Sequence, residues 1–149
     1  MTCSLCLPTP HEILWQDDFC RVVLLNDADY PAYCRIELLA HVKEMTDLDA
    51  LSQLKFMKIV FAVEAAMREV IKPDKINLAS LGNKTPHLHW HLIPRFADDK
   101  HFPNSHWGEA VRHDGTNDAL GANSHALSRH VKTIFIDKVK AHVECALQD

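Results

Sequence analysis

The stretch H-L-H-W-H-L-I at residues 87–93 constrains the fold most, because histidines and large apolar residues alternate along it. Successive side chains of a β-strand point to opposite faces, so the histidines would share one face and the apolar residues the other. This pattern predicts a strand whose apolar face packs on a hydrophobic core. The histidines are His87, His89 and His91, and the apolar residues are Leu88, Trp90 and Leu92.

Three imidazoles on one face of a strand suit phosphate chemistry. Neighbours on that face lie about 7 Å apart, so one phosphate group can touch two rings. An imidazole offers a nucleophilic nitrogen at neutral pH while its other nitrogen donates a hydrogen bond that sets the tautomer. The same spacing also fits the polar side of an exposed strand, or a three-histidine metal site. Spacing alone leaves the three interpretations open.

Composition and charge indicate the number of domains, the partners and the location expected of the protein. A chain of 149 residues with 47% hydrophobic content is expected to form a single domain. Its 16 Lys and Arg against 20 Asp and Glu give a net charge of -4, which argues against a nucleic-acid partner. The first twenty residues lack the basic start and apolar run of a secretory signal, and no stretch resembles a membrane span. We therefore expect a cytoplasmic protein without a membrane partner.

Extended segments are predicted at five places. The first three are separated by turn-rich pieces such as N-D-A-D-Y-P, which indicates an antiparallel meander. The last two are joined by G-N-K-T-P, a connection of hairpin length, and Pro94 is expected to end the second of them. The segments are residues 13–15, 21–26, 35–41, 75–81 and 87–93.

A long helix is predicted between the two groups of strands. Thr46 and Asp49 resemble a capping box, and apolar residues at helical spacing then continue as far as Pro73. Its apolar face comprises Phe56, Ile59, Val60, Val63, Met67, Val70 and Ile71.

The C-terminal third is expected to be a long loop followed by a second helix. Residues 98–123 are rich in Asp, Asn, Gly and His, and Trp107 is expected to anchor this surface loop. The helix is predicted from about residue 124 to residue 147. Its inward stripe is predicted to be Leu127, Val131, Ile134 and Phe135.

The alternating segment matches the His-apolar-His-apolar-His-apolar-apolar signature of the histidine triad (HIT) family, and Pro94 and Arg95 follow it as in many members. The resemblance extends over about residues 3–96. It implies an α+β, HIT-like fold, with an antiparallel sheet of about five strands, one long helix and a C-terminal helical extension. It also implies a core at residues 1–96, with residues 97–149 packed on the same domain, and a homodimer.

The resemblance implies hydrolysis or transfer of a nucleotide at its α phosphate. His89 would attack phosphorus and form a covalent nucleotidyl-imidazole, which water would resolve. His91 would contact the phosphate or leaving-group oxygen, and His87 would brace the site. The substrate would be a purine nucleotide, either a nucleoside phosphoramidate or a (di)nucleoside polyphosphate. The alternatives are a nucleotide- or metal-binding module with little turnover, or a phosphohistidine carrier.

The family pattern also implies substrate-binding positions. Asn26 matches the residue that contacts the ribose in relatives, although a plain turn-starting asparagine is an equal alternative. Two positions depart from the family, since Lys84 replaces a hydroxyl residue and Cys34 stands where many relatives carry a fourth histidine. The hairpin residues that would supply donors to phosphoryl oxygens are Asn77, Gly82, Asn83 and Lys84.

Five cysteines without a dense pattern suit free thiols or a metal site better than a disulfide framework. In some bacterial HIT proteins a pair spaced like Cys3 and Cys6 binds zinc together with two histidines, which correspond here to His41 and His87. Two thiolates and two imidazoles are a usual complement of structural zinc. Most of the remaining histidines are expected to be solvated.

Overall fold

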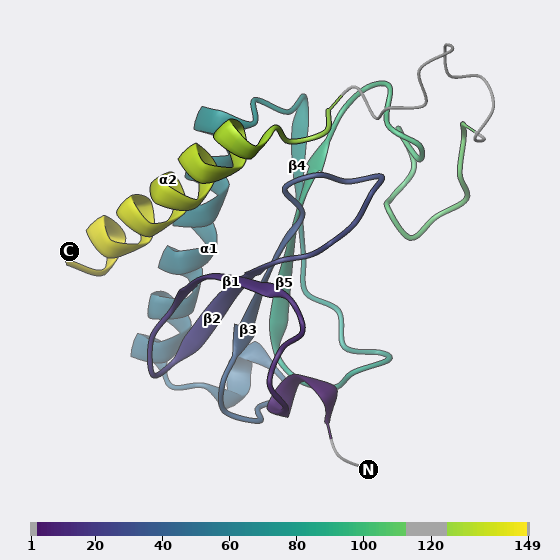
Figure 1. The fold of residues 1–149 in the computed structure, drawn as a ribbon. Coiled ribbons are helices and arrows are strands. Elements are labelled where there is room, and N and C mark those ends of the chain that lie inside the picture. The colour runs from purple at the N-terminus through teal and green to yellow at the C-terminus, as the bar shows by residue number, and fades with distance from the viewer. Residues whose placement is uncertain (1–2, 113–124, 149) are drawn as a thin grey trace.

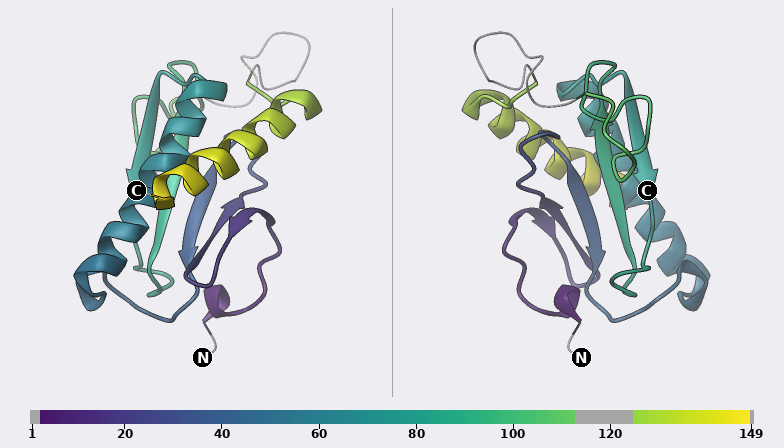
Figure 2. Two further views of the ribbon diagram at one scale, coloured as in Figure 1. Left: turned by 90° about the vertical axis from the view of Figure 1, so that its left-hand side faces the viewer. Right: turned by 90° about the vertical axis from the view of Figure 1, so that its right-hand side faces the viewer.

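The computed structural model describes residues 3–112 and 125–148. Five strands form one antiparallel sheet in the order β1-β2-β3-β5-β4, and two long helices lie together on one side of it (Figures 1 and 2). The predicted α+β fold and the N-terminal meander are confirmed. The strands are β1 Glu12–Gln16, β2 Cys20–Leu24, β3 Cys34–Leu38, β4 Lys75–Ala79 and β5 His89–Arg95, and the helices are α1 Ala50–Val70 and α2 Arg129–Gln148.

Strand β5 lies inside the sheet, between β3 and β4. Leu88 and Leu92 are buried in the core beneath the helices, as the alternation predicts. The predicted ends of this strand were wrong, because β5 begins at His89 and continues through Pro94. Pairing with β3 stops at Leu92 while pairing with β4 runs on to Arg95. Pro94 therefore lies where β5 has one neighbour, and a missing N–H is tolerated there.

The first turn of α1 corrects the predicted capping box. Asp49 is itself the N-cap, and its carboxylate accepts hydrogen bonds from the backbone N–H groups of Leu51 and Ser52, each at 3.0 Å. A capping box does form nearby, but it belongs to the short 3-10 turn Met45–Asp47. The predicted apolar face is confirmed: Phe56, Ile59, Val60, Val63 and Met67 are buried, and Val70 and Ile71 pack against the core.

Helix α2 packs on α1 and on β1. Its buried side chains are Phe135, Val139 and Val143, so the prediction for Phe135 is confirmed. Ile134 was wrongly assigned to the inward stripe, since 37% of it is exposed. The predicted start near residue 124 lies outside the described residues. Among the residues described, no helix combines the length and the apolar character that a membrane span needs.

The two ends of the sheet carry different segments (Figure 1). At one end the N-terminal 3-10 turn, Ser4–Cys6, lies near the connection between β4 and β5. At the other end the segment that follows β5 is tied to the sheet by Arg95, whose guanidinium lies 2.7 Å from the carboxylate of Asp99. Both side chains are only 3% exposed. The described part of the predicted surface loop, residues 98–112, is therefore anchored by a buried ion pair.

Candidate active site and metal centre

Strands β3 and β5 bring charged and imidazole side chains to the face of the sheet opposite the helices. Arg35 pairs with His91 across the two strands, and Glu37 pairs with His89. Directly paired residues of antiparallel strands point to the same face. The two rings are largely buried, with 6% of His89 and 8% of His91 exposed. The central histidine therefore lies in a partly enclosed polar site rather than on an open surface.

The hydrogen bonds of His89 determine which of its nitrogens carries the proton. Its Nδ1 lies 2.5 Å from the backbone carbonyl oxygen of His87. A carbonyl oxygen can only accept, so Nδ1 must donate, and in the neutral ring Nε2 then carries a lone pair. This is the arrangement that a nucleophilic imidazole needs.

The same reasoning continues through the next ring. Nε2 of His91 lies 3.1 Å from Nε2 of His89, so it must donate to that lone pair. Nδ1 of His91 is then an acceptor, and the hydroxyl of Tyr33, 2.7 Å away, donates to it. A chain of directed hydrogen bonds thus runs from Tyr33 through His91 and His89 to the carbonyl of His87.

The surroundings of His89 and His91 favour the neutral form of both imidazole rings. Burial is the largest cause that lowers the pKa of His91, to about 3, and the charges of His89, Arg35 and His106 act in the same direction. Burial also lowers the pKa of His89, where the hydrogen bond to the His87 carbonyl acts the other way. Both imidazoles are therefore neutral near pH 7.

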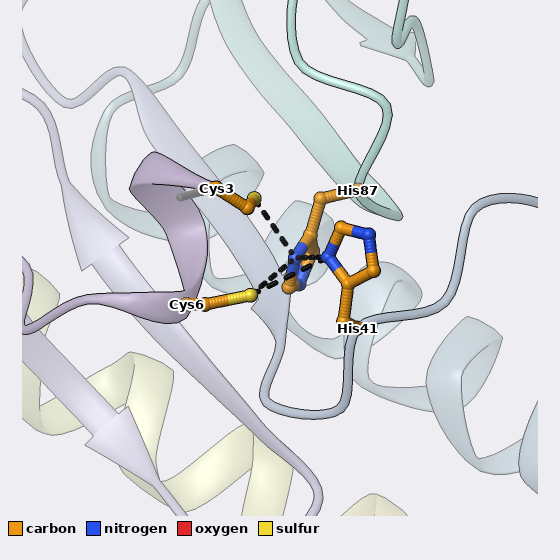
Figure 3. A group of neighbouring side chains, drawn as sticks. All are labelled: Cys3, Cys6, His41 and His87. Carbon is orange, nitrogen blue, oxygen red and sulfur yellow. Dashed lines mark hydrogen bonds between the residues drawn. The ribbon is translucent and has the colours of Figure 1, made fainter. Parts of the chain in front are cut away.

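The ring of His87 faces away from this series of hydrogen bonds, and both of its nitrogens have polar neighbours. Nε2 donates to the backbone carbonyl of Leu38 at 2.7 Å, so Nδ1 is the nitrogen with the lone pair. Nδ1 points toward Cys3, Cys6 and His41 (Figure 3). His87 is fully buried, and it contacts His89 through its backbone carbonyl.

These four side chains form a compact group of metal-ligand atoms. The Nδ1 atoms of His41 and His87 lie 3.2 Å apart, three of the four sulfur-to-nitrogen distances are 3.4, 3.4 and 3.5 Å, and all of the ligand atoms lie within 4.8 Å of one another. Bonds of about 2.0 Å to nitrogen and about 2.3 Å to sulfur place the ligands of a tetrahedral zinc about 3.3–3.8 Å apart. The donor set and these four short distances suit a tetrahedral ion. The structure thus brings together the four residues predicted from the sequence.

Comparison with known proteins identifies the family. The model of the HIT domain matches residues 8–98, which is more than half of the chain. This chain belongs to the HIT family. No curated protein matches the sequence significantly.

Solved HIT proteins share the fold over most of their length. A histidine triad protein from Bradyrhizobium japonicum is 28% identical, covers 89% of this chain and 90% of its own, and has a TM-score of 0.66. One from Marinobacter aquaeolei VT8 is 23% identical, with 91% and 90% covered and a TM-score of 0.67. A Zn-bound histidine triad family protein from Mycobacterium smegmatis is 12% identical, with 92% and 89% covered and a TM-score of 0.58. The likeness to the last two shows the fold alone.

The substrate-binding residues expected from the HIT pattern lie in three separate segments of the chain. Asn26 is exposed just beyond the end of β2. Asn77 lies on β4 opposite Ile93, and its side-chain oxygen accepts a hydrogen bond from Arg95 at 2.7 Å. The structure thus places Asn77 with Arg95 at the far end of β5. Gly82, Asn83 and Lys84 lie in the connection that leads to His87, and Asn83 and Lys84 are exposed.

Tyr33 is a residue that the sequence reasoning missed. The resemblance to the family pointed to the neighbouring Cys34, but Cys34 is fully buried and its thiol contacts the backbone carbonyl of Ala32. Burial raises the pKa of this thiol. Since β3 alternates faces, the residue before Cys34 points to the triad side. The period of two was therefore a signal that could have identified Tyr33.

The segment after β5 also contributes side chains to this face, among them a histidine that was expected to be solvated. The ring of Trp107 lies 5.0 Å from that of His91, and His106 packs edge-on against Tyr30, Tyr33 and Trp107. The side chain of His106 is only 16% exposed, so the expectation of a solvated histidine was wrong there. Trp107 anchors the segment as predicted, although 49% of it stays exposed.

Proposed function

We propose that this protein is a nucleotide hydrolase or nucleotidyl transferase that cleaves at the α phosphate through a covalent nucleotidyl-His89. The substrate would be a purine nucleoside phosphoramidate or a (di)nucleoside polyphosphate. The observation that carries the proposal is the hydrogen bond from Nδ1 of His89 to the His87 carbonyl, which leaves the lone pair on Nε2. Membership of the HIT family supports the same chemistry.

The reaction would occur in two displacements. Nε2 of His89 forms a bond to the α phosphorus, and the bond to the leaving group breaks with its electron pair passing to the leaving group. A water or another acceptor then attacks phosphorus, releases the nucleotide and returns the electron pair to Nε2. In such transfers most of the rate enhancement comes from positioning and from donors directed at the phosphoryl oxygens.

His91 and Tyr33 would act in this reaction at stated atoms. The N–H of His91 points at Nε2 of His89, which is where the phosphoryl group would arrive. On substrate binding this N–H would turn to a phosphoryl or leaving-group oxygen. Tyr33 would be a positioning residue, because its hydroxyl holds His91 in the tautomer that has its proton on Nε2.

The metal centre would be structural zinc held by Cys3, Cys6, His41 and His87. The close spacing of their ligand atoms supports this assignment. A bound ion would crosslink the N-terminal segment to the triad strand and fix the ring of His87. All four ligand positions are then occupied by protein, as in closed structural sites.

The remaining assignments extend the proposal to recognition and assembly. Asn26 would contact the ribose, and the connection that carries Gly82, Asn83 and Lys84 would approach the phosphates. Lys84 can do so as a point charge. Pairing of two copies into a homodimer, expected from the resemblance to the family, is part of the same proposal.

The decisive experiment follows both product and intermediate. The protein is incubated with adenosine 5′-phosphoramidate and with diadenosine triphosphate, release of monophosphate is measured, and acid-quenched samples are weighed by mass spectrometry. Wild type should release AMP and carry a transient mass increase of one adenylyl group. His89→Ala should lose both, whereas His130→Ala, on the exposed start of α2, should keep them. Binding of nucleotide without turnover by wild type would favour the binding-module alternative and contradict the proposal.

A further inference from the structure

A cavity of about 220 Å³ opens beside His89. This volume is several times the ~30 Å³ that a water molecule occupies in the liquid. The cavity lies between the N-terminal segment and the triad face of the sheet, and His89 forms part of its lining. Its polar walls include Ser4, Thr9 and His11 from the N-terminal segment, Thr85 from the β4–β5 connection, and Arg21 and Arg35 from the sheet.

The sheet side of this cavity carries a net positive charge. Glu37 is fully buried and accepts hydrogen bonds from Nε of Arg21 at 2.6 Å and from Nε of Arg35 at 2.7 Å. Two guanidinium groups therefore share one carboxylate. The group of three has a charge of +1 in a partly enclosed place, where electrostatic attraction to an anion is stronger than in bulk water.

The two arginines differ in how many donors remain for a ligand. Nη2 of Arg21 donates to the backbone carbonyls of Leu5 and Leu7, at 3.1 and 3.2 Å, so this side chain holds the N-terminal segment in place. Among the described residues, the hydrogen bonds and ion pairs of Arg35 all go to Glu37. The side chain of Arg35 is 19% exposed. Arg35 therefore has more N–H groups available to a molecule in the cavity than Arg21, whose side chain is also less exposed.

The register of the sheet places this charge next to the reacting groups. Arg35 lies directly opposite His91, and Glu37 lies opposite His89. A phosphate joined to the α phosphate at His89 would thus be within the reach of a long guanidinium side chain. The neutral state of His91 acts in the same sense, because a departing phosphate needs no proton whereas a departing amine does.

We propose that this cavity binds a second phosphate group of the substrate through Arg35, and so selects nucleotides with a phosphate leaving group over nucleotides with an amine leaving group. The inference rests on the proposed function and narrows its substrate class to polyphosphates. In the chemical step the bond between the α phosphorus and the bridging oxygen breaks. That oxygen keeps the electron pair, and the departing phosphate stays paired with Arg35.

A binding measurement tests the subsite without turnover. Calorimetry compares AMP with adenosine 5′-(α,β-methylene)diphosphate, whose second phosphate cannot be removed at the α position. Wild type should bind the diphosphate analogue at least about tenfold more tightly, as expected for a charge-assisted contact. Arg35→Gln should reduce that ratio to below about three. Arg68→Gln, on the exposed surface of α1, is the matched control and should keep the wild-type ratio.

Two further variants guard against a folding defect, because Arg35→Gln leaves the buried carboxylate of Glu37 with one partner fewer. The double variant Arg35→Gln with Glu37→Gln removes both charges of the pair, and it should also lose the preference for the diphosphate analogue over AMP. Arg35→Lys keeps the positive charge and should retain part of that preference. A wild type that gains nothing from the second phosphate, or an Arg35→Gln variant that keeps the gain, would overturn the inference.

Kinetics separate the inference from the proposed function. For diadenosine triphosphate, kcat/KM should fall about tenfold or more in Arg35→Gln, and for adenosine 5′-phosphoramidate it should fall less than about threefold. Equal losses on both substrates would assign Arg35 to the support of the histidines and overturn the subsite. A protein that shows the binding gain but turns over neither substrate would contradict the proposed function alone.

Discussion

The hydroxyl of Tyr33 lies 2.7 Å from Nδ1 of His91, and this contact sets the direction of the hydrogen bonds that reach His89. Burial raises the pKa of this phenol, so it remains a donor through the physiological range. Cys34, its neighbour in sequence, is directed into the core. In this HIT protein a tyrosine on the triad face therefore supports the third histidine of the motif.

Replacement of Tyr33 by Phe should change the tautomer of His91 before it changes the fold. Without the donor, the His91 ring is free to place its proton on Nδ1, and kcat should fall about tenfold with little change in KM. The ¹⁵N chemical shifts of His91 should report a protonated Nε2 in wild type and a mixture in Tyr33→Phe.

Tyr30→Phe is the matched control, since the Tyr30 hydroxyl contacts Asp99 and His101 rather than the triad. It should lower the free energy of unfolding and leave the His91 tautomer unchanged. Identical ¹⁵N spectra for Tyr33→Phe and wild type would mean that Tyr33 does not position the ring.

Removal of zinc should loosen the N-terminal segment. Elemental analysis of protein purified without chelators should give about one zinc per chain, and Cys6→Ser should reduce it strongly. Extraction of the ion should lower Tm by more than about 5 °C, because binding free energy at such sites contributes to folding. Cys145→Ser, on the exposed side of α2, should retain the metal. Full stability and no stoichiometric zinc in wild type would refute the assignment.

The ion pair between Arg95 and Asp99 should be worth far more than the exposed ion pairs. Asp99 also accepts hydrogen bonds from the backbone N–H groups of Phe96, His101 and Phe102. Asp99→Asn would leave a buried guanidinium without its counter-charge, which costs about 3–5 kcal/mol. Glu69→Gln, in exposed pairs with Lys138 and His142, should lower the free energy of unfolding far less. Urea unfolding of the two variants should show this difference. Equal losses in the free energy of unfolding would argue that buried Arg95 does not need a counter-charge.

Acid should destabilise the fold through His91 in a defined range. Its pKa is lowered to about 3 in the folded state from an ordinary value of 6.5. Above pH 6.5 the ring is neutral in both states and contributes nothing. As pH falls from 6.5 toward 3 the unfolded chain binds a proton that the folded chain does not, so the free energy of unfolding decreases by a few kcal/mol.

The measurement compares urea unfolding of wild type and His91→Gln at pH 7, 5.5 and 4. The variant should lose less stability over this range. The carboxyl of Asp99, whose pKa is lowered to about 2, weakens both proteins equally at the acid end. If the free energy of unfolding of the two proteins fell in parallel with pH, the pKa of His91 would not be lowered in the folded state.

The strand of alternating histidines could be predicted from sequence because one observation, the period of two, determines both its conformation and its faces. The grouping of Cys3, Cys6, His41 and His87 could be predicted for a similar reason, since a short cysteine spacing and a family resemblance specify its members. The cap of α1 could not be located to the residue, because Thr46, Asp47 and Asp49 are all good N-cap residues and backbone geometry decides among them.

The polar contacts around the triad could not be predicted from the sequence for another reason. Tyr30 and Tyr33 meet partners that lie more than fifty residues away in the chain, Asp99 and His91. No local pattern specifies which long-range partner a tyrosine will find. The direction of the hydrogen bonds follows only from distances between particular atoms.

The cavity next to His89 takes one wall from the first residues of the chain, and this has a practical effect on how the protein should be prepared. An oligohistidine purification tag fused ahead of Cys3 would bring extra imidazoles to the residues proposed to bind zinc, and bulk to this cavity. A tag placed after α2, which packs on the opposite side of the sheet, avoids both forms of interference. Assays that compare leaving groups are best run on material of that design.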